Sequence, residues 1–292
     1  MAAARLVWHR APRTMDKATV RVPASTSNLG PGFDCLGVAL RLFNRISVAR
    51  GKRVELSSMI SEAADAFFAS AGKRSFRFAA IIEGDVPRSR GLGSSVTVRL
   101  GVMHGLNDLL GRPLGREAIF QLCAKLEGHP DNAAPAEFGG FNVIRGVLRQ
   151  RFAVAEELQF VLLIPKFEVA TTKARALLPT EISRRSAVES CGNACAITAA
   201  FASTKYENLR GAFADGLHQP FRKPLIPFFD DAVRAAENAG ALGAFLSGSG
   251  STIAAVTLRN ADKIARAMRA AASADAQTII TSADNRGVVI LR

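Results

Sequence analysis

A short run of glycine and serine between residues 87 and 95 has the composition of a phosphate-binding loop. It reads PRSRGLGSS, follows a strand-like segment and leads directly into a predicted helix. Gly91 and Gly93 let the backbone turn tightly, so that its N–H groups and the positive end of the helix point toward an anion. The hydroxyls of Ser94 and Ser95 can contact phosphate or a metal ion. Taken alone, the run is equally consistent with a glycine turn and a serine cap.

Three other segments carry side chains that could do chemistry. In the loop over residues 23–34, the Asn28 amide and the Asp34 carboxylate suit a hydroxyl or an ammonium group, or form an ordinary Asx turn. Residues 127–132 place two carboxylates, an imidazole and an amide at the end of a predicted helix, a density that is hard to explain structurally. Residues 240–252 form a second glycine–serine loop, which alone predicts a flexible turn.

The spacing of apolar residues predicts the elements that position these loops. Strands are predicted at residues 18–23, 44–49, 75–83, 141–147 and 158–164, and β-character returns at 240–258 and 277–291. Helices are predicted at residues 57–71, 94–110, 117–127, 187–204 and 229–239. This mixed order favours an α+β fold over an alternating parallel sheet, and we expect a domain seam near residues 150–157.

Length and composition exclude several classes of protein. The chain has 292 residues, 48% of them hydrophobic, which is enough for a sizeable core. No run approaches the roughly 18 apolar residues that a transmembrane helix needs. The formal net charge of +13 favours anionic partners. Because the basic residues are scattered and the chain has one Trp and one Tyr, a phosphate-attracting field or simple solvation is favoured over nucleic-acid binding.

Cysteine usage and the first residues bear on the compartment. The four cysteines do not indicate a disulfide framework and no secretory signal peptide precedes them, so we expect a cytoplasmic protein. Cys191 and Cys195 share a helix face and could bind a metal, but no second pair completes a site, so we interpret them as small core residues. Residues 1–15 hold three arginines and no acid and are predicted to be a disordered extension.

In sequence order, these segments resemble the successive signatures of the small-molecule kinases named for galactokinase, homoserine kinase, mevalonate kinase and phosphomevalonate kinase. The resemblance is closest to the homoserine kinases and covers residues 18 to about 258. The matching stretches are ASTSNLGPGFDCLGVAL, PRSRGLGSS, EGHPDNAAPAEFGGF, TTKARALLP, LHQPFRKPLIP and GALGAFLSGSGST. The phosphate loop is common to the whole superfamily, whereas EGHPDN, TxxAR and HQPxR are more specific.

The resemblance implies a two-domain α+β fold, with an N-terminal domain like ribosomal protein S5 domain 2 and a ferredoxin-like C-terminal domain. We expect residues 16–155 to form the N-terminal ATP-binding domain and residues 156–292 the C-terminal domain. The implied reaction transfers the ATP γ-phosphate to the side-chain hydroxyl of L-homoserine, which gives O-phospho-L-homoserine in threonine biosynthesis. The implied enzyme uses Mg²⁺, acts on small molecules rather than at a membrane, and is expected to form a homodimer.

The resemblance also implies roles for individual residues. The residues expected to hold the triphosphate are Pro87, Arg88, Ser89, Arg90, Gly91, Leu92, Gly93, Ser94 and Ser95. Those expected to bind the amino acid are Asn28, Asp34, His129, Arg175 and Arg222. Ser95 and Glu127 would contact Mg²⁺, Asn132 would lie near the reacting hydroxyl, and Thr171 near the transferred phosphoryl group.

Elementary chemistry agrees with this division of roles. Homoserine is a zwitterion, so a carboxylate suits its ammonium group and two guanidinium groups suit its carboxylate. Phosphoryl transfer needs positioning and charge neutralisation more than a strong base, so no general base is nominated. Asp131 lies beside the site, but orienting the turn through bonds to the backbone would explain it equally well.

The chain departs from the family in two places, and two other hypotheses stay open. The segment before the phosphate loop is shortened to the helix at residues 57–71, without the family's asparagine near the adenine, and Val96-Thr97-Val98 replaces common alanines. One alternative is a kinase of the same superfamily for a sugar or isoprenoid alcohol, which would leave Arg175 and Arg222 unpaired. The other is a catalytically inactive paralogue that binds RNA through its positive charge.

Overall fold

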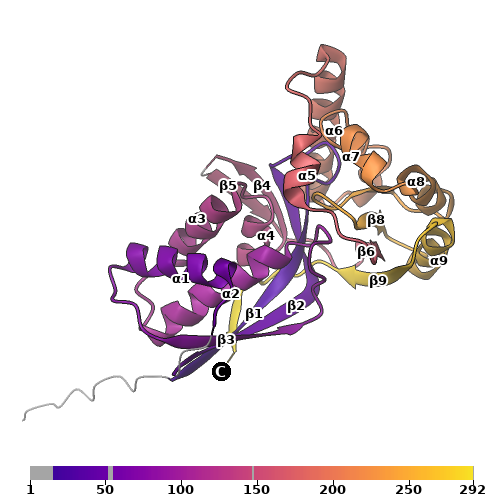
Figure 1. The fold of residues 1–292 in the computed structure, drawn as a ribbon. Coiled ribbons are helices and arrows are strands. Elements are labelled where there is room, and N and C mark those ends of the chain that lie inside the picture. Colours follow the sequence, from indigo (N-terminus) through magenta and orange to yellow (C-terminus); the bar gives the residue numbers. More distant parts are fainter. Residues whose placement is uncertain (1–15, 52–54, 147, 292) are drawn as a thin grey trace, which may run out of the picture.

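The computed structural model describes residues 16–51, 55–146 and 148–291, so the extension expected at residues 1–15 lies outside the described residues. Within these ranges the chain forms a six-stranded and a four-stranded sheet, each with helices packed on one face (Figure 1). This arrangement confirms the two-domain α+β fold.

The first sheet carries the loops that hold most of the polar residues of interest. Its strands are β1 (Lys17–Ser27), β2 (Leu36–Arg50), β3 (Phe78–Gly84), β4 (Phe141–Arg145), β5 (Leu148–Phe152) and β10 (Val289–Leu291). Their order is β10-β1-β2-β4-β5, and β3 pairs with β2. Ala18, Val20 and Val22 of β1 are buried in alternation with more accessible residues, as a half-covered strand requires.

Within the described ranges, four helices cover the buried face of the first sheet. They are α1 (Ser58–Ala71), α2 (Ser94–Leu109), α3 (Arg116–Glu127) and α4 (Ala133–Phe138). The apolar residues of α2 at spacings of three and four, such as Val96, Leu100 and Met103, are buried in one core with the strands, which confirms the predicted helix. α3 ends at Glu127 because Gly128 adopts a left-handed conformation, with φ at 79°.

The second sheet has the strand order of a ferredoxin-like domain. Its strands are β6 (Gln159–Pro165), β7 (Gly243–Leu246), β8 (Ile253–Thr257) and β9 (Ala276–Ser282), in the order β7-β8-β6-β9. Helices α8 (Phe229–Asn238) and α9 (Ala261–Ala271) follow the first and third of these strands in the chain and pack together on the sheet. The chain between β6 and α8 forms α5 (Thr171–Ala176), α6 (Arg184–Ser203), η1 (Tyr206–Leu209), α7 (Gln219–Arg222) and η2 (Lys223–Leu225).

An apolar core lies between the two sheets. Successive residues of β6 alternate between two clusters: Phe160 faces this shared core, whereas Val161 faces α8 and α9. From the first sheet, Phe141 enters the shared core and stacks on Phe201 of α6 with 4.1 Å between ring centroids. The two domains are therefore joined by close-packed apolar side chains.

The chain crosses between the sheets twice, and the crossings lie side by side. The first runs from β5 to β6 and the second from β9 to β10. The Asn285 side chain of the second crossing accepts a hydrogen bond from Val154 N at 2.9 Å and donates one to Val154 O at 2.8 Å. β10 pairs antiparallel with β1, so residues 289–291 lie in the first sheet rather than with the domain expected at 156–292. This pairing covers an edge of β1 that would otherwise be open.

Other differences from the sequence-based expectations have local causes. β1 extends beyond residue 23 to Ser27, because the small polar residues that follow pair with β2. β5, which pairs with β4, lies within or next to the expected seam, and α4, α5 and α9 were not predicted.

Cys191 and Cys195 are exposed on α6, so their interpretation as core residues is wrong. Ile197 and Phe201 form the buried side of that helix. No helix among the described residues is long and apolar enough to span a bilayer.

Candidate active site

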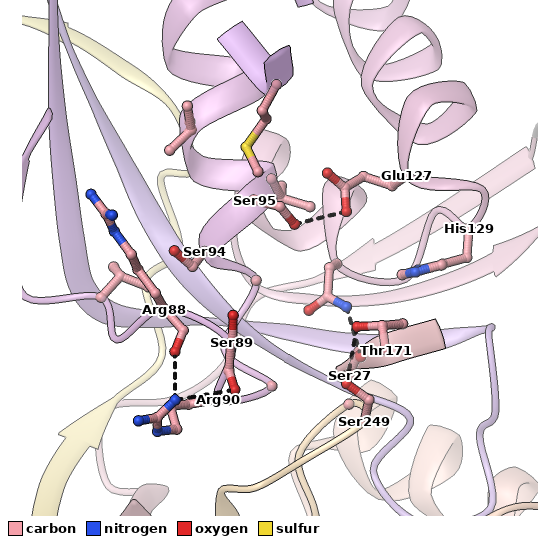
Figure 2. A pocket seen from close by; sticks show the side chains of 18 of the residues that line it. Ser27, Arg88, Ser89, Arg90, Ser94, Ser95, Glu127, His129, Thr171 and Ser249 are labelled. Atoms are coloured by element: carbon pink, nitrogen blue, oxygen red, sulfur yellow. Dashed lines mark hydrogen bonds between the residues drawn. The ribbon is translucent and has the colours of Figure 1, made fainter. Parts of the chain in front are cut away.

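A cavity of about 720 Å³ opens where loops from both domains meet. It is lined by the glycine loop between β3 and α2, the turn after α3, the start of α5 and the loop between β7 and β8 (Figure 2). Every sequence-predicted site residue lines this cavity except Pro87 and Leu92. Leu92 is buried in the shared core beneath the loop, and Pro87 lines a smaller hollow beside it.

The glycine loop needs its glycines for contacts with other loops as well as for turning. Gly91 and Gly93 adopt positive φ angles of 74° and 66°. A Cβ atom on Gly91 would lie 2.1 Å from the carbonyl oxygen of Ser247, and one on Gly93 would lie 2.3 Å from Ser25 Oγ. Ser247 Oγ also donates a hydrogen bond to Gly91 O at 2.6 Å. The two glycine–serine loops are thus packed against each other, and the first residues of α2 line the cavity beside them.

The side chain of Arg90, which lies in the N-terminal domain, binds residues of the C-terminal domain. Its guanidinium donates to the carbonyl oxygens of Pro165, at 2.8 Å, and of Lys166, and forms an ion pair with Glu168 at 3.2 Å. Arg90 therefore fixes the glycine loop to the end of β6. Only the remaining donors of the loop, among them its backbone, are free to face a phosphate.

Ser95 and Glu127 form a pair suited to a metal ion. Ser95 Oγ donates to Glu127 Oε2 at 2.8 Å, so the bond joins the first turn of α2 to the last residue of α3 (Figure 2). The other carboxylate oxygen, Oε1, lies 2.8 Å from Nε of Arg99, but the angle does not suit a hydrogen bond, so Oε1 is buried without a donor. Hydroxyl and carboxylate oxygens are ligands that Mg²⁺ prefers, and Oε1 keeps a lone pair that no hydrogen bond uses. These residues fit the metal that the sequence resemblance implies.

Asn132 and Thr171 both line the cavity, and each contacts serine hydroxyl groups of another loop. The Asn132 side chain is fixed at both ends, since Oδ1 accepts from Ser25 Oγ and Nδ2 donates to Ser27 Oγ, each at 2.9 Å. Thr171, the first residue of α5, lies 3.2 Å from Ser249 through their hydroxyl groups. Neutral hydrogen-bonding groups thus stand between the glycine loop and the charged end of the cavity.

The charged end of the cavity contains an ion pair between the domains. Both guanidinium ends of Arg175 in α5 contact the Asp34 carboxylate, at 3.0 Å and 2.7 Å. Asp34 is held by a hydrogen bond from its own N–H to Asn28 Oδ1 at 3.0 Å, and Asn28 Nδ2 donates to Gly248 O. The side chains of Asp34 and Arg175 are about one-third exposed, and both line the cavity.

Arg222 lies deeper and has no carboxylate partner among the residues that the structure describes. It is 2% exposed and donates to Gly248 O at 3.2 Å and, more weakly, to Ala174 O. Burial, followed by repulsion from Arg175, lowers the pKa of Arg222 to about 10, so it stays charged at neutral pH. A buried cation without a counter-ion is the mark of an anion site.

His218 packs against Arg222 and the loop that contains Gly30 and Phe33, and it was not among the predicted site residues. Its Nε2 lies 2.8 Å from Gly30 O, and its ring stacks on Phe33 with 5.3 Å between centroids. Its Nδ1 lies 3.3 Å from NH1 of Arg222. Burial lowers the pKa of His218 to about 4, and the charge of Arg222 acts in the same direction against Asp215. The neutral imidazole can therefore accept from the guanidinium.

His129 and Asp131 form a second hydrogen-bonded pair at the mouth of the cavity. His129 Nδ1 and Asp131 Oδ1 lie 2.6 Å apart, and Asp131 Oδ1 also accepts from Asn132 N at 3.0 Å. Burial lowers the pKa of His129, but the hydrogen bond and the charge of Asp131 outweigh it, so the pKa is raised. Asp131 orients the turn, as the sequence suggested, and in addition faces the cavity.

Several residues of the site had weak signals in the sequence. Ser25 and Ser27, which fix Asn132, lie in a segment whose polar character was noted without assigning them a role. Ser249 lies in the second glycine–serine loop, which was recognised as part of the resemblance but not as a contact of Thr171. Arg99 follows Ser95 by four residues on α2, a spacing that places both on one helix face, and this periodicity could have identified it.

Comparisons with known proteins show which family the chain resembles. The model of the GHMP kinases N terminal domain matches residues 58–140, and that of the GHMP kinases C terminal domain matches residues 198–274. A homoserine kinase of Halothermothrix orenii is 36% identical, over 93% of this chain and 96% of the relative. A homoserine kinase of Deinococcus radiodurans is 41% identical, over 80% of this chain and 82% of the relative.

Solved structures show the same fold. The crystal structure of homoserine kinase from Cytophaga hutchinsonii superposes with a TM-score of 0.88 at 25% identity, covering 98% of this chain and all of that one. The mevalonate kinase of Methanococcus jannaschii, at 14% identity, superposes with a TM-score of 0.71 over 93% of this chain and 99% of its own, which shows the fold alone.

Proposed function

The chain belongs to the GHMP kinase family, and from this premise we propose that it transfers the γ-phosphate of ATP to the side-chain hydroxyl of L-homoserine. The product is O-phospho-L-homoserine, an intermediate for threonine biosynthesis, and the enzyme works in the cytoplasm. Curated relatives named homoserine kinase, similar over nearly the whole chain, support this substrate.

The observation that carries the proposal is the buried guanidinium of Arg222. A charge at 2% exposure is costly unless a counter-ion meets it, and none does among the described residues. The α-carboxylate of an amino acid would complete this site, because it offers two oxygens to the guanidinium fork. A neutral sugar or isoprenoid alcohol would leave the charge unpaired.

The Asp34–Arg175 pair suits a substrate that carries both a positive and a negative charge. In the structure the two charges pair with each other. A zwitterion placed between them supplies an ammonium group for Asp34 and a carboxylate for Arg175 and Arg222, so both protein charges stay paired when the substrate enters. Binding then exchanges one set of ion pairs for another, and a ligand with only one of the two charges cannot do so.

Phosphoryl transfer is served by the end of the cavity that holds the glycine loop. The backbone amides of the glycine loop bind the triphosphate, and Asn132 and Thr171 orient the hydroxyl and the phosphoryl group. The hydroxyl oxygen forms the new bond to the γ-phosphorus as the bond to the ADP oxygen breaks, and the hydroxyl proton leaves to solvent. Ser95 and Glu127 would hold Mg²⁺, which neutralises charge on the triphosphate when bound.

An assay of ADP release with a matched set of alcohols tests the proposal. The set comprises L-homoserine, 4-hydroxybutyrate, which lacks the ammonium group, and 3-aminopropan-1-ol, which lacks the carboxylate. We expect L-homoserine to give the highest kcat/KM and each analogue a value at least about 100-fold lower, since each leaves a desolvated charge unpaired. Turnover of mevalonate or a sugar without turnover of L-homoserine would show that the acceptor is a different alcohol.

Assembly and domain division complete the proposal. We propose that the enzyme is a homodimer, so light scattering during gel filtration will give twice the 31.0 kDa of the chain. We also propose that the boundary between its domains lies at residues 155 and 156, with β10 returned to the first domain. Limited proteolysis that cuts first between β5 and β6 would support this boundary.

A further inference from the structure

Arg99 is the charged group nearest to the proposed metal ligand, and no function described above uses it. It lies one helical turn after Ser95 on α2, and its Nε is 2.8 Å from Glu127 Oε1. Both side chains are nearly buried, with 12% and 10% exposed. At this depth water does little to screen the two charges from each other.

The nitrogen atoms of Arg99 make few hydrogen bonds. Its NH2 reaches Glu62 of α1 at 3.3 Å, and Glu62 is half exposed. NH1 and Nε are buried without a hydrogen-bond acceptor, although Nε stands at ion-pair distance from Glu127. The guanidinium therefore stands at ion-pair distance from Oε1 and offsets the charge of Glu127, so a divalent cation that uses this oxygen has to compete with it.

We propose that Arg99 is a positioning residue that holds the Glu127 carboxylate beside Ser95 and weakens the binding of divalent cations to the nucleotide-free enzyme. The inference rests on the proposed function, because it takes Glu127 and Ser95 as the metal ligands. Its physical basis is competition, since the guanidinium already offsets the negative charge that would attract the ion.

This arrangement has a consequence for the order of binding. Without nucleotide, the site offers a divalent cation one carboxylate whose charge is shared with Arg99, together with a neutral hydroxyl. The triphosphate of ATP adds several negative charges on the same side of the cavity. The enzyme therefore binds the metal ion more weakly without ATP than together with it.

Titration of the nucleotide-free protein with Mn²⁺, followed by the electron paramagnetic resonance signal of the free ion, tests this without measuring activity. Charges at such distances change the affinity of a carboxylate for a cation by about tenfold or more. We therefore expect Arg99→Met to bind Mn²⁺ at least about tenfold more tightly than the wild type. Arg99→Gln is the second uncharged variant and keeps a polar side chain should the first fail to fold. Circular dichroism verifies the fold of each.

Three controls make the result specific. Arg99→Lys keeps the charge and should bind Mn²⁺ within about threefold of the wild type. Arg234→Met removes the same charge from an exposed position on α8, where Arg234 pairs with Asp231, and should leave Mn²⁺ binding unchanged. Glu127→Gln in the Arg99→Met background should abolish the added binding, because the ion loses its carboxylate ligand.

Two results would overturn the proposal: unchanged or weaker Mn²⁺ binding in a folded uncharged variant, or tighter binding that persists after Glu127→Gln. The role of Arg99 and the proposed function can be tested independently of each other. If homoserine is not phosphorylated but the Mn²⁺ affinities change as expected, the acceptor is wrong and the role of Arg99 stands. If homoserine is phosphorylated and Mn²⁺ affinities do not change, the role of Arg99 is wrong and the enzyme assignment stands.

Discussion

The two ends of the cavity solve the problem of binding an anion in opposite ways. At the glycine loop, the backbone, serine hydroxyls and the exposed side chain of Arg88 line the cavity, and the side chain of Arg90 is turned to the carbonyl oxygens of the neighbouring domain. At the other end, the anion site is a buried guanidinium beside an ion pair between Asp34 and Arg175. The first end depends mainly on backbone shape, with one exposed charge, and the second depends on buried side-chain charge.

This difference predicts how each end responds to change. The glycine loop is stabilised by contacts within the folded protein, so its failure should come from crowding of the backbone. The charged end holds groups that are costly to bury, so its failure should come from loss or addition of a charge. Changes at the two ends should therefore affect different substrates.

The largest effect is expected from Arg222→Met. Removing the buried guanidinium takes away the anchor for the substrate carboxylate, and truncating one partner of a buried charge pair costs about 2–5 kcal/mol. We expect kcat/KM for L-homoserine to fall about 100-fold or more, mainly through KM, while KM for ATP changes less than about threefold. Steady-state kinetics with each substrate varied in turn measures both.

Arg234→Met provides the matched control for that loss of charge, and it should leave both KM values unchanged. Arg222→Lys should recover part of the loss, because it restores the charge without the two-pronged geometry. An equal increase of both KM values in Arg222→Met would contradict the separation of the two ends.

The next effect concerns pH and His218. Its folded pKa of about 4 lies below its usual value of 6.5, so the unfolded state binds more protons between these two values. Stability contributed by the neutral imidazole is complete above about pH 6.5 and is lost as the pH falls toward 4, by about 3 kcal/mol. Urea unfolding of wild type and His218→Gln across this range measures the difference.

In His218→Gln the part of the pH dependence that comes from the imidazole should disappear, because an amide does not titrate. Asp215, Asp34 and Arg222 are the charged groups whose fields act on His218, and they are present in both proteins. Parallel stability curves for the two proteins would show that the imidazole is not kept neutral by the fold.

A smaller effect is expected from Gly91→Ala at the glycine loop. Gly111, just after α2, has nearly the same φ as Gly91, 76° against 74°, but a Cβ there would meet nothing within 4 Å. Gly111→Ala should therefore cost only the strain of the backbone angle, about 1 kcal/mol. Gly91→Ala should cost about 1–3 kcal/mol more, because its Cβ meets Ser247 O. Urea unfolding compares the two variants.

Gly91→Ala should also raise KM for ATP and leave KM for L-homoserine within about threefold. If the two alanine variants were equally stable, the loops would have moved apart without cost, and close packing would not explain the glycine.

Much of this site was predictable from local sequence. The helix of α2 follows from its apolar spacing, and the end of α3 follows from Gly128, so the positions of Ser95 and Glu127 at a cavity mouth could be inferred. The charged residues Asp34, Arg175 and Arg222 come from three distant segments; the resemblance assigned them to one site, and all three line the same cavity. Their pairing could not be inferred from it.

The parts that escaped prediction depend on contacts distant in the chain. α5 is only six residues long, and its position is set by contacts with other segments, such as Thr171 with Ser249. β10 reads as an ordinary apolar strand, and nothing local indicates that it pairs with β1 rather than in the second sheet. The approach of Arg99 to Glu127 requires knowing how α2 packs on α3.

The paired crossings between the domains lie beside the apolar core that the two sheets share. Because Val154 and Asn285 hydrogen-bond each other in both directions, the two connections form one cross-linked strap rather than two independent linkers. The strap and the close-packed core both resist movement of one sheet against the other. The spacing between the two ends of the cavity is therefore fixed by the packing of the domains and not by the loops alone.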